Sequence, residues 1–102
     1  MAMSLLASPS WGYKQEDLDK LAATNTCQEC ALAGADLHLA YLREANLEKA
    51  ILTKANLAGA DLRGTVLTGT VLRDAKIDFA DFTKAKFCNT VMPDGQRIFK
   101  DC

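Results

Sequence analysis

Histidine, tryptophan and proline are scarce in this sequence, which has one histidine (His38), one tryptophan and two prolines in 102 residues. It contains no Ser-His-Asp or Cys-His arrangement, no HExxH motif and no glycine-rich phosphate loop. His38 falls at a position that we expect to face solvent, which disfavours a role as a general base. The sequence therefore predicts a protein without enzymatic activity, and without catalytic residues, a metal site or a cofactor.

Neither sign of charge dominates, and long apolar runs are missing. Twelve basic and 13 acidic side chains give a formal net charge of -1. This balance argues against nonspecific nucleic-acid binding through a basic face, and also against a strongly acidic DNA mimic. No run of about 18 apolar residues occurs, so the sequence predicts no membrane span.

What the sequence does contain is a five-residue repeat. Residues 30–94 divide into 13 consecutive units without an insertion, beginning CALAG, ADLHL, AYLRE and ANLEK. The first position of each unit is always small: Ala in nine units, Thr in three and Cys30 in one. The third position is Leu in nine units and Ile77, Phe82, Phe87 and Met92 in the last four. These two positions are the candidates for a buried core.

A period of five fits neither a regular helix nor a straight strand. On an α-helix, five residues advance by about 500°, so the leucines would move around the cylinder. On a strand, an odd repeat would turn successive leucines to opposite faces. Both conflicts disappear if each unit is a very short strand followed by a corner, with positions one and three pointing inward. Stacked coils of such strands form a parallel β-solenoid.

The fifth position of the units fits a corner. A corner can require positive φ, which glycine adopts without steric cost and which Asn and Asp tolerate. The residues of these three types at this position are Gly34, Gly59, Gly64, Gly69, Asp74, Asn89 and Asp94.

The units follow an A(D/N)LXX pattern and resemble those of the pentapeptide-repeat family over 65 of the 102 residues. The resemblance implies an all-β solenoid, a right-handed quadrilateral parallel β-helix with four units per coil. Thirteen units then give about three coils, roughly 16 Å tall at about 4.8 Å per strand spacing. We expect an N-terminal leader and capping helix over 1–29, the β-helix over 30–94 and a C-terminal cap over 95–102.

Four units per coil would place the third-position side chains in four vertical stacks. We interpret the two phenylalanines near the C-terminal end as core packing and not as a ligand pocket. The predicted core stacks are Leu32, Leu52, Leu72 and Met92; Leu37, Leu57 and Ile77; Leu42, Leu62 and Phe82; and Leu47, Leu67 and Phe87.

Residues 14–24 (KQEDLDKLAAT) predict a short helix with an apolar face formed by Leu18, Leu21 and Ala22. An open solenoid needs its ends covered, because an end coil presents unpaired backbone and apolar side chains. We interpret this helix as the N-terminal cap, and a membrane-surface helix is the alternative. Trp11 and Tyr13 are expected to pack over the first coil, with an exposed contact site as the alternative.

The four cysteines, an even number, indicate an oxidising compartment. Cys27 and Cys30 form a CxxC pair that precedes a β-coil and not a helix, so we expect a structural disulfide and not a thioredoxin-type redox pair. A Cys88–Cys102 disulfide would close a 15-residue loop and stabilise the fold by about 3 kcal/mol. The two pairs lie at opposite ends of the predicted stack, so they cannot share one zinc ion within a chain.

An apolar column departs from the family pattern, which prefers Asp or Asn at position two. On one side this position is Ala31, Ile51, Val71 and Val91, and Val66 on the adjoining side extends it. One interpretation is that β-branched residues simply favour strands and that a cap covers part of the column. Our hypothesis is that Ile51, Val66, Val71 and Val91 form a contact face for a protein partner or for self-association.

Charged side chains also stack on an outer side. Asp61 and Asp81 are expected to lie in one column, with their repulsion relieved by Arg63, Lys84 and solvent. We interpret them as a solvated face and not as an acid/base pair. Arg43 and Arg63 form a second column, where an anion site is a weaker alternative.

These observations predict a non-enzymatic interaction or scaffold module with a protein partner or self-association, no nucleic-acid partner and no small-molecule substrate. The alternatives are a gyrase-binding DNA mimic, like the longer, acidic quinolone-resistance branch of the family, and a thiol-redox protein acting through Cys27 and Cys30. The resemblance implies a cyanobacterial or plastid setting, and the cysteines favour the periplasm or thylakoid lumen. Residues 1–7 are too short for a signal peptide, so we expect a mature chain behind a few added residues, from a precursor with an export signal.

Overall fold

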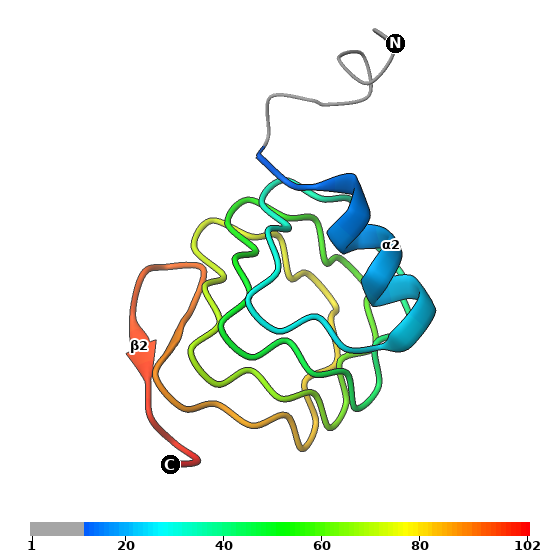
Figure 1. Cartoon of the computed structure of the whole chain (residues 1–102). Coiled ribbons are helices and arrows are strands. Elements are labelled where there is room, and N and C mark those ends of the chain that lie inside the picture. Colours follow the sequence, from blue (N-terminus) through cyan, green and yellow to red (C-terminus); the bar gives the residue numbers. More distant parts are fainter. Residues whose placement is uncertain (1–11) are drawn as a thin grey trace, which may run out of the picture.

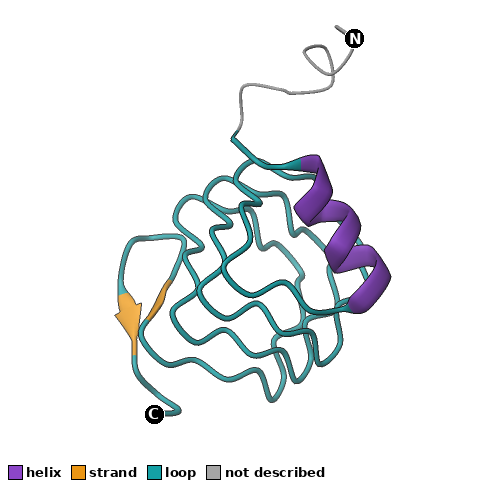
Figure 2. Cartoon of the chain, viewed as in Figure 1, coloured by secondary structure: helices purple, strands orange, loops and turns teal. Residues whose placement is uncertain are grey.

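The computed structural model describes residues 12–102 and winds them in coils around one axis (Figure 1). The elements in chain order are helix α2 (Gln15–Thr24), strand β1 (Thr90–Val91) and strand β2 (Arg97–Ile98). Loops and turns make up the remaining coils (Figure 2). The prediction for Trp11 lies outside the described residues, whereas Tyr13 is half-buried and packs against the core. No helix within residues 12–102 has the length and apolar character needed to cross a bilayer.

Parallel bridges join each five-residue unit to the unit four places further along the chain. On one side Ala31 pairs with Ile51, Ile51 with Val71 and Val71 with Val91. The other three sides repeat this spacing, starting with the pairing of Thr26 and Asn46. Each side contributes single bridges and not extended strands, because the chain turns a corner before a longer ladder can form.

Each unit of an inner coil is hydrogen-bonded to the coils on both sides of it. The N–H of Leu52 donates to the carbonyl of Val71 at 2.7 Å, and the N–H of Ile51 donates to the carbonyl of Cys30 at 2.9 Å. Within the unit, the N–H of Ala55 donates to the carbonyl of Leu52 at 3.0 Å and closes the corner. The backbone of an inner coil is therefore paired in both directions along the axis.

The axis of the solenoid is filled by the side chains of the third position. All nine leucines at this position are buried, and Phe87 is buried with them. Ile77, Phe82 and Met92 are half-buried and pack against this core. They lie in the last coil, so within the described residues no further coil covers them.

The corners impose a left-handed backbone whatever the residue. Every fifth-position residue from 29 to 89 has positive φ, including the bulky Leu39 (58°) and Phe79 (60°). Asp94, expected to share this geometry, does not adopt it, and the positive φ falls on Gly95 (89°). The reason is a turn in which the N–H of Gly95 donates to the carbonyl of Met92 at 2.8 Å, which ends the repeat.

Helix α2 lies across the N-terminal end of the stack. The N–H of Lys14 donates to the carbonyl of Ala31 at 3.0 Å, and the carboxylate of Asp17 accepts from the N–H of Ala31 at 2.8 Å. Leu21 is buried in the core, whereas Ala22, which we placed on the same face, is exposed. The segment that contains the helix therefore supplies both backbone and side-chain partners to the first coil.

At the C-terminal end, β2 pairs antiparallel with β1, and the tail that follows returns beside the last coil. The N–H of Asp101 donates to the carbonyl of Phe87 at 2.8 Å, and its carboxylate accepts from the N–H of Phe87 at 2.9 Å. Ile98 packs against the core, but Phe99 is exposed. Neighbouring side chains of an extended segment point to opposite faces, so only one of the two meets the core.

Candidate interaction surfaces

Two disulfides lie at opposite ends of the solenoid. Cys27 is bonded to Cys30, with their Cα atoms 5.3 Å apart, and Cys88 is bonded to Cys102, with 5.1 Å between Cα atoms. Cys27 and Cys30 are 0% and 3% exposed, and the Cys27 sulfur lies 3.2 Å from the carbonyl oxygen of Asp17 in α2. A reactive thiol pair needs access to solvent, so this buried disulfide does not favour a redox site.

Metal or acid/base chemistry would depend on the possible metal ligands and the one histidine. In residues 12–102, no group of three His, Cys, Asp or Glu side chains is placed to hold a metal ion. His38 is exposed, and its Nδ1 lies 2.7 Å from Oδ1 of Asp36. Hydrogen bonds from His38 lower the pKa of the Asp36 carboxyl. This pair is therefore an exposed surface contact.

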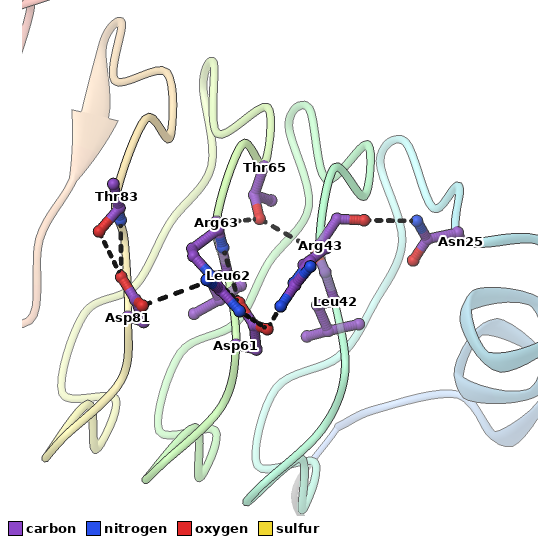
Figure 3. A network of polar contacts seen from close by, with 9 residues as sticks. All are labelled: Asn25, Leu42, Arg43, Asp61, Leu62, Arg63, Thr65, Asp81 and Thr83. Atoms are coloured by element: carbon purple, nitrogen blue, oxygen red, sulfur yellow. Dashed lines mark hydrogen bonds and ion pairs between the residues drawn. The ribbon is translucent and has the colours of Figure 1, made fainter.

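A ladder of alternating charges runs along one outer side, across three coils (Figure 3). Nε of Arg43 lies 2.8 Å from Oδ2 of Asp61, and Nε of Arg63 lies 2.9 Å from Oδ1 of Asp61. Arg63 continues the ladder to Asp81, with Nε 3.6 Å from Oδ2. Thr83 donates its hydroxyl to Asp81 at 2.6 Å. The guanidinium group of Arg63 lies between the two carboxylates and offsets their repulsion, as expected.

The positive and negative charges of the ladder neutralise one another. Hydrogen bonds from Arg63 and then Arg43 lower the pKa of the Asp61 carboxyl well below its usual range, and those from Thr83 lower the pKa of Asp81. Both arginines face the Asp61 carboxylate, whose side chain is only 16% exposed. This arrangement weakens the case for an anion site at Arg43 and Arg63, because a carboxylate of the chain already lies between them.

The predicted contact face is only partly exposed. Ile51 is 41% exposed, and Val66 and Val71 are half-buried on the outer surface. Val91 is only 4% exposed, so its inclusion in that face was wrong. Val91 lies between Val71 on one side and β2 on the other, and these two neighbouring segments cover it. The remaining three residues are called the apolar strip below.

The largest exposed apolar groups lie elsewhere, and we did not name them as site residues from the sequence. Leu39, Tyr41 and Phe79 are 73%, 74% and 97% exposed. The guanidinium of Arg43 covers part of Tyr41, 5.3 Å from the ring centroid. The sequence does contain a signal for two of them, since Leu39 and Phe79 occupy the fifth, corner position, whose side chains point away from the axis.

Comparison with solved structures finds other repeat proteins. HetL, a pentapeptide repeat protein involved in heterocyst differentiation regulation in the cyanobacterium Nostoc sp. strain PCC 7120, is 28% identical over 72% of this chain, with a TM-score of 0.46. This chain spans only 43% of HetL. The pentapeptide repeat protein alr5209 of Nostoc PCC 7120 is 23% identical over 83% of this chain and 79% of its own length, with a TM-score of 0.48. No curated protein matches the sequence.

The family comparison covers most of the repeat region. The model for pentapeptide repeats, in eight copies, matches residues 26–58 and 50–89. Together these ranges span 26–89, which is 64 of the 102 residues. They include nearly all the five-residue units that stack in the coils, and the match implies a right-handed β-helical solenoid. The chain therefore belongs to the pentapeptide repeat family, as its repeat predicted.

Proposed function

We propose that this chain is a non-enzymatic scaffold module that binds a protein partner through the apolar strip, Ile51, Val66 and Val71. The observation that carries the proposal is the exposure of Ile51, which is 41% exposed on an outer face where the family pattern prefers Asp or Asn. Ile51 and Val71 are bridged neighbours, so their side chains are contiguous. Contiguous exposed apolar side chains rimmed by polar ones are typical of interaction sites.

The rigidity of the stack suits such a role. In this proposal the solenoid has about three coils, with α2 as the N-terminal cap and residues 95–102 as the C-terminal cap. The disulfide Cys88–Cys102 joins the C-terminal cap to the last coil, and Cys27–Cys30 lies against α2. Both favour an oxidising compartment such as the periplasm or thylakoid lumen. A rigid face loses little conformational freedom on binding, so more of its contact energy appears as affinity.

The proposal is tested by charging the strip. Ile51→Glu together with Val71→Glu would place two carboxylates at its centre. We expect this variant to stay folded by circular dichroism, because the corresponding positions Asp61 and Asp81 already carry two bridged carboxylates. It should lose its captured partner from an extract of the native compartment, or shift to a lower mass in sedimentation.

The matched control changes position two on the adjoining side of the same two coils. Asn56 and Lys76 are bridged as Ile51 and Val71 are, so Asn56→Glu together with Lys76→Glu adds the same side chains at the same height. This control should keep the partner and the mass. If the strip variant keeps both as well, the strip is not a binding surface.

A further inference from the structure

Within residues 12–102, half of the C-terminal end of the solenoid has an unpaired backbone edge. In the coil before it, the third- and fifth-position N–H groups donate to the last coil, for example Leu57 to the carbonyl of Lys76 and Gly59 to that of Asp78, both at 2.8 Å. In the last coil the corresponding donors on two sides, 75–79 and 80–84, have no acceptor within residues 12–102. These four N–H groups belong to Ile77, Phe79, Phe82 and Lys84.

On the other two sides of the same coil the C-terminal tail satisfies the third-position donors, whereas the fifth-position N–H of Asn89 also has no acceptor within residues 12–102. The N–H of Phe87 donates to the Asp101 carboxylate at 2.9 Å, and the N–H of Met92 donates to the carbonyl of Gln96 at 2.8 Å. The C-terminal tail therefore covers one half of the end with a carboxylate and a carbonyl. We call the uncovered sides, residues 75–84, the open half.

The open half is rich in donors. The four free N–H groups are accompanied by only two carbonyls that point the same way, those of Ala75 and Ala80. The equivalent carbonyls one coil earlier, Ala55 and Ala60, accept from the last coil at 2.9 Å. The side chains beside this edge carry both signs and nearly cancel, with Lys76 and Lys84 against Asp78 and Asp81. Because the side-chain charges cancel, the backbone N–H donors determine which ligands the open half prefers, and they favour ligands with hydrogen-bond acceptors.

Apolar surface adjoins these donors. Phe79, at the corner between the two open sides, is 97% exposed and has a left-handed φ of 60°, an unfavourable backbone for a bulky residue. A shallow hollow of about 380 Å³ lies on the same end of the molecule. The hollow is lined by Ile77, Met92, Pro93, Asp94, Gln96 and Ile98.

A second copy of the chain does not fit this edge. Stacking the N-terminal end of one copy on the open half of another would offer acceptors, but α2 lies across that end (Figure 1). Joining two C-terminal ends would place donor rows against donor rows. An extended segment with an excess of acceptors is not blocked by a helix and does not place donors against donors.

We propose that the open half binds a carboxylate-bearing segment of a partner protein by strand addition, with a short extended stretch along each open side and a bend at the Phe79 corner. Backbone carbonyls and carboxylates of the segment accept from the N–H groups of Ile77, Phe79, Phe82 and Lys84. An apolar side chain of the segment enters the adjoining hollow, with Phe79 packed against the segment. Asp101 on Phe87 and Asp17 on Ala31 make the same carboxylate contact within the chain, at 2.9 and 2.8 Å. Strand addition to a free sheet edge is a recurrent mode of peptide recognition.

The first test uses a defined probe, a terminally blocked octapeptide of alternating glutamate and valine, with lysine in place of glutamate as the control peptide. In ¹⁵N-labelled protein at low salt, the acidic peptide should shift the amide signals of Ile77, Phe79, Phe82 and Lys84. It should also slow their hydrogen exchange by tenfold or more at saturation. Equal effects from the two peptides, shifts elsewhere, or no shift at millimolar peptide would overturn the proposal.

The second test uses a matched pair of variants. Phe79→Asn and Leu39→Asn change the same corner position two coils apart, and Asn tolerates the left-handed backbone, so both variants should fold. Phe79→Asn should weaken peptide binding by about tenfold, the loss expected of an anchoring aromatic residue. Leu39→Asn should leave it unchanged. Equal affinities for the two variants would contradict the assignment.

This site is independent of the apolar strip. The strip variant Ile51→Glu with Val71→Glu should bind the acidic peptide as the unmodified chain does. If it loses the peptide while remaining folded, the open half is not the binding surface. If that variant loses the captured partner but still binds the peptide, the strip and the open half are two separate binding surfaces.

Discussion

Truncating one central leucine should cost this small protein a large part of its stability. Leu52 is fully buried in the middle of its stack, between Leu32 and Leu72 in the neighbouring coils. Its N–H is bonded to the carbonyl of Val71 at 2.7 Å, which holds the backbone in place. The surrounding coils therefore have little freedom to collapse into the space left by Leu52→Ala.

The expected loss follows from the burial. Replacing a fully buried leucine by alanine costs about 3–5 kcal/mol where the site relaxes poorly. Domains of this size are stable by roughly 5–15 kcal/mol, and each 1 kcal/mol shifts the melting temperature by about 4–8 °C. We therefore expect Leu52→Ala to lower the melting temperature by at least about 12 °C, and to lower the urea midpoint in proportion.

The measurement is urea and thermal unfolding followed by far-UV circular dichroism, with the disulfides intact. Thr53→Ala, in the same unit but half-exposed, is the matched control and should cost less than about 1 kcal/mol. Met92→Ala, half-buried at the end of the same stack, should fall between the two. A loss for Leu52→Ala no greater than that for Thr53→Ala would refute the axial packing described here.

Three further outcomes follow from the polar and covalent contacts. Thr70→Val removes a buried hydrogen bond from Oγ1 to the carbonyl of Leu47 (2.7 Å). It should lower the free energy of unfolding in urea by about 1 kcal/mol, and an unchanged midpoint would show that the hydrogen bond does not stabilise the fold. Cys88→Ser with Cys102→Ser opens a loop of about 15 residues and should lower the free energy of unfolding by about 3 kcal/mol in the same assay. A decrease below about 1 kcal/mol would contradict a stabilising role for this disulfide. The folded pKa of Asp61 is lowered below its ordinary 3.8, so its contribution is present above that pH and is lost as the pH falls toward the lowered value. The difference in melting temperature between the unmodified chain and Asp61→Asn should therefore shrink below about pH 4 and in high salt, and a pH-independent difference would contradict the ladder.

The repeat could be predicted from the sequence because each unit's shape depends on its own five residues. Small residues at the first position and large apolar ones at the third, with corners at the fifth, follow from a chain that bends at every unit. The period predicted a solenoid, and the resemblance supplied the number of sides. The bridges between units four places apart, such as Ile51–Val71, are the structural counterpart of that expectation.

The ends of the stack were harder to predict, because they depend on where the segments outside the repeat pack against it. The burial of Val91 follows from β2 lying beside it, and a five-residue pattern contains no information about a segment that follows the repeat. The half-exposure of Phe82 has the same origin, because its unit obeys the pattern but no further coil covers it within the described residues. The position of the positive φ at Gly95, and not at Asp94, depends on the turn that ends the repeat.

The charge ladder was predicted only in part. Stacking placed Asp61 and Asp81 in one column with Arg63 beside them, as the structure has it, but it did not determine that Arg43, and not Lys84, would be the second cation to pair. Arg43 and Arg63 both reach Asp61, and this choice depends on side-chain geometry that column positions do not specify.

The central claim is that one coil takes four five-residue units, so that each third-position N–H of an inner coil meets a carbonyl in the unit four places further on. Scalar coupling across hydrogen bonds, measured between backbone ¹⁵N and ¹³C′ nuclei in labelled protein, tests this directly. The structure predicts coupling from the nitrogen of Leu52 to the carbonyl carbon of Val71, whose oxygen lies 2.7 Å from that nitrogen. Coupling to the carbonyl of Val66, as in a coil of three units, or to that of Glu48, as in an α-helix, would contradict the claim.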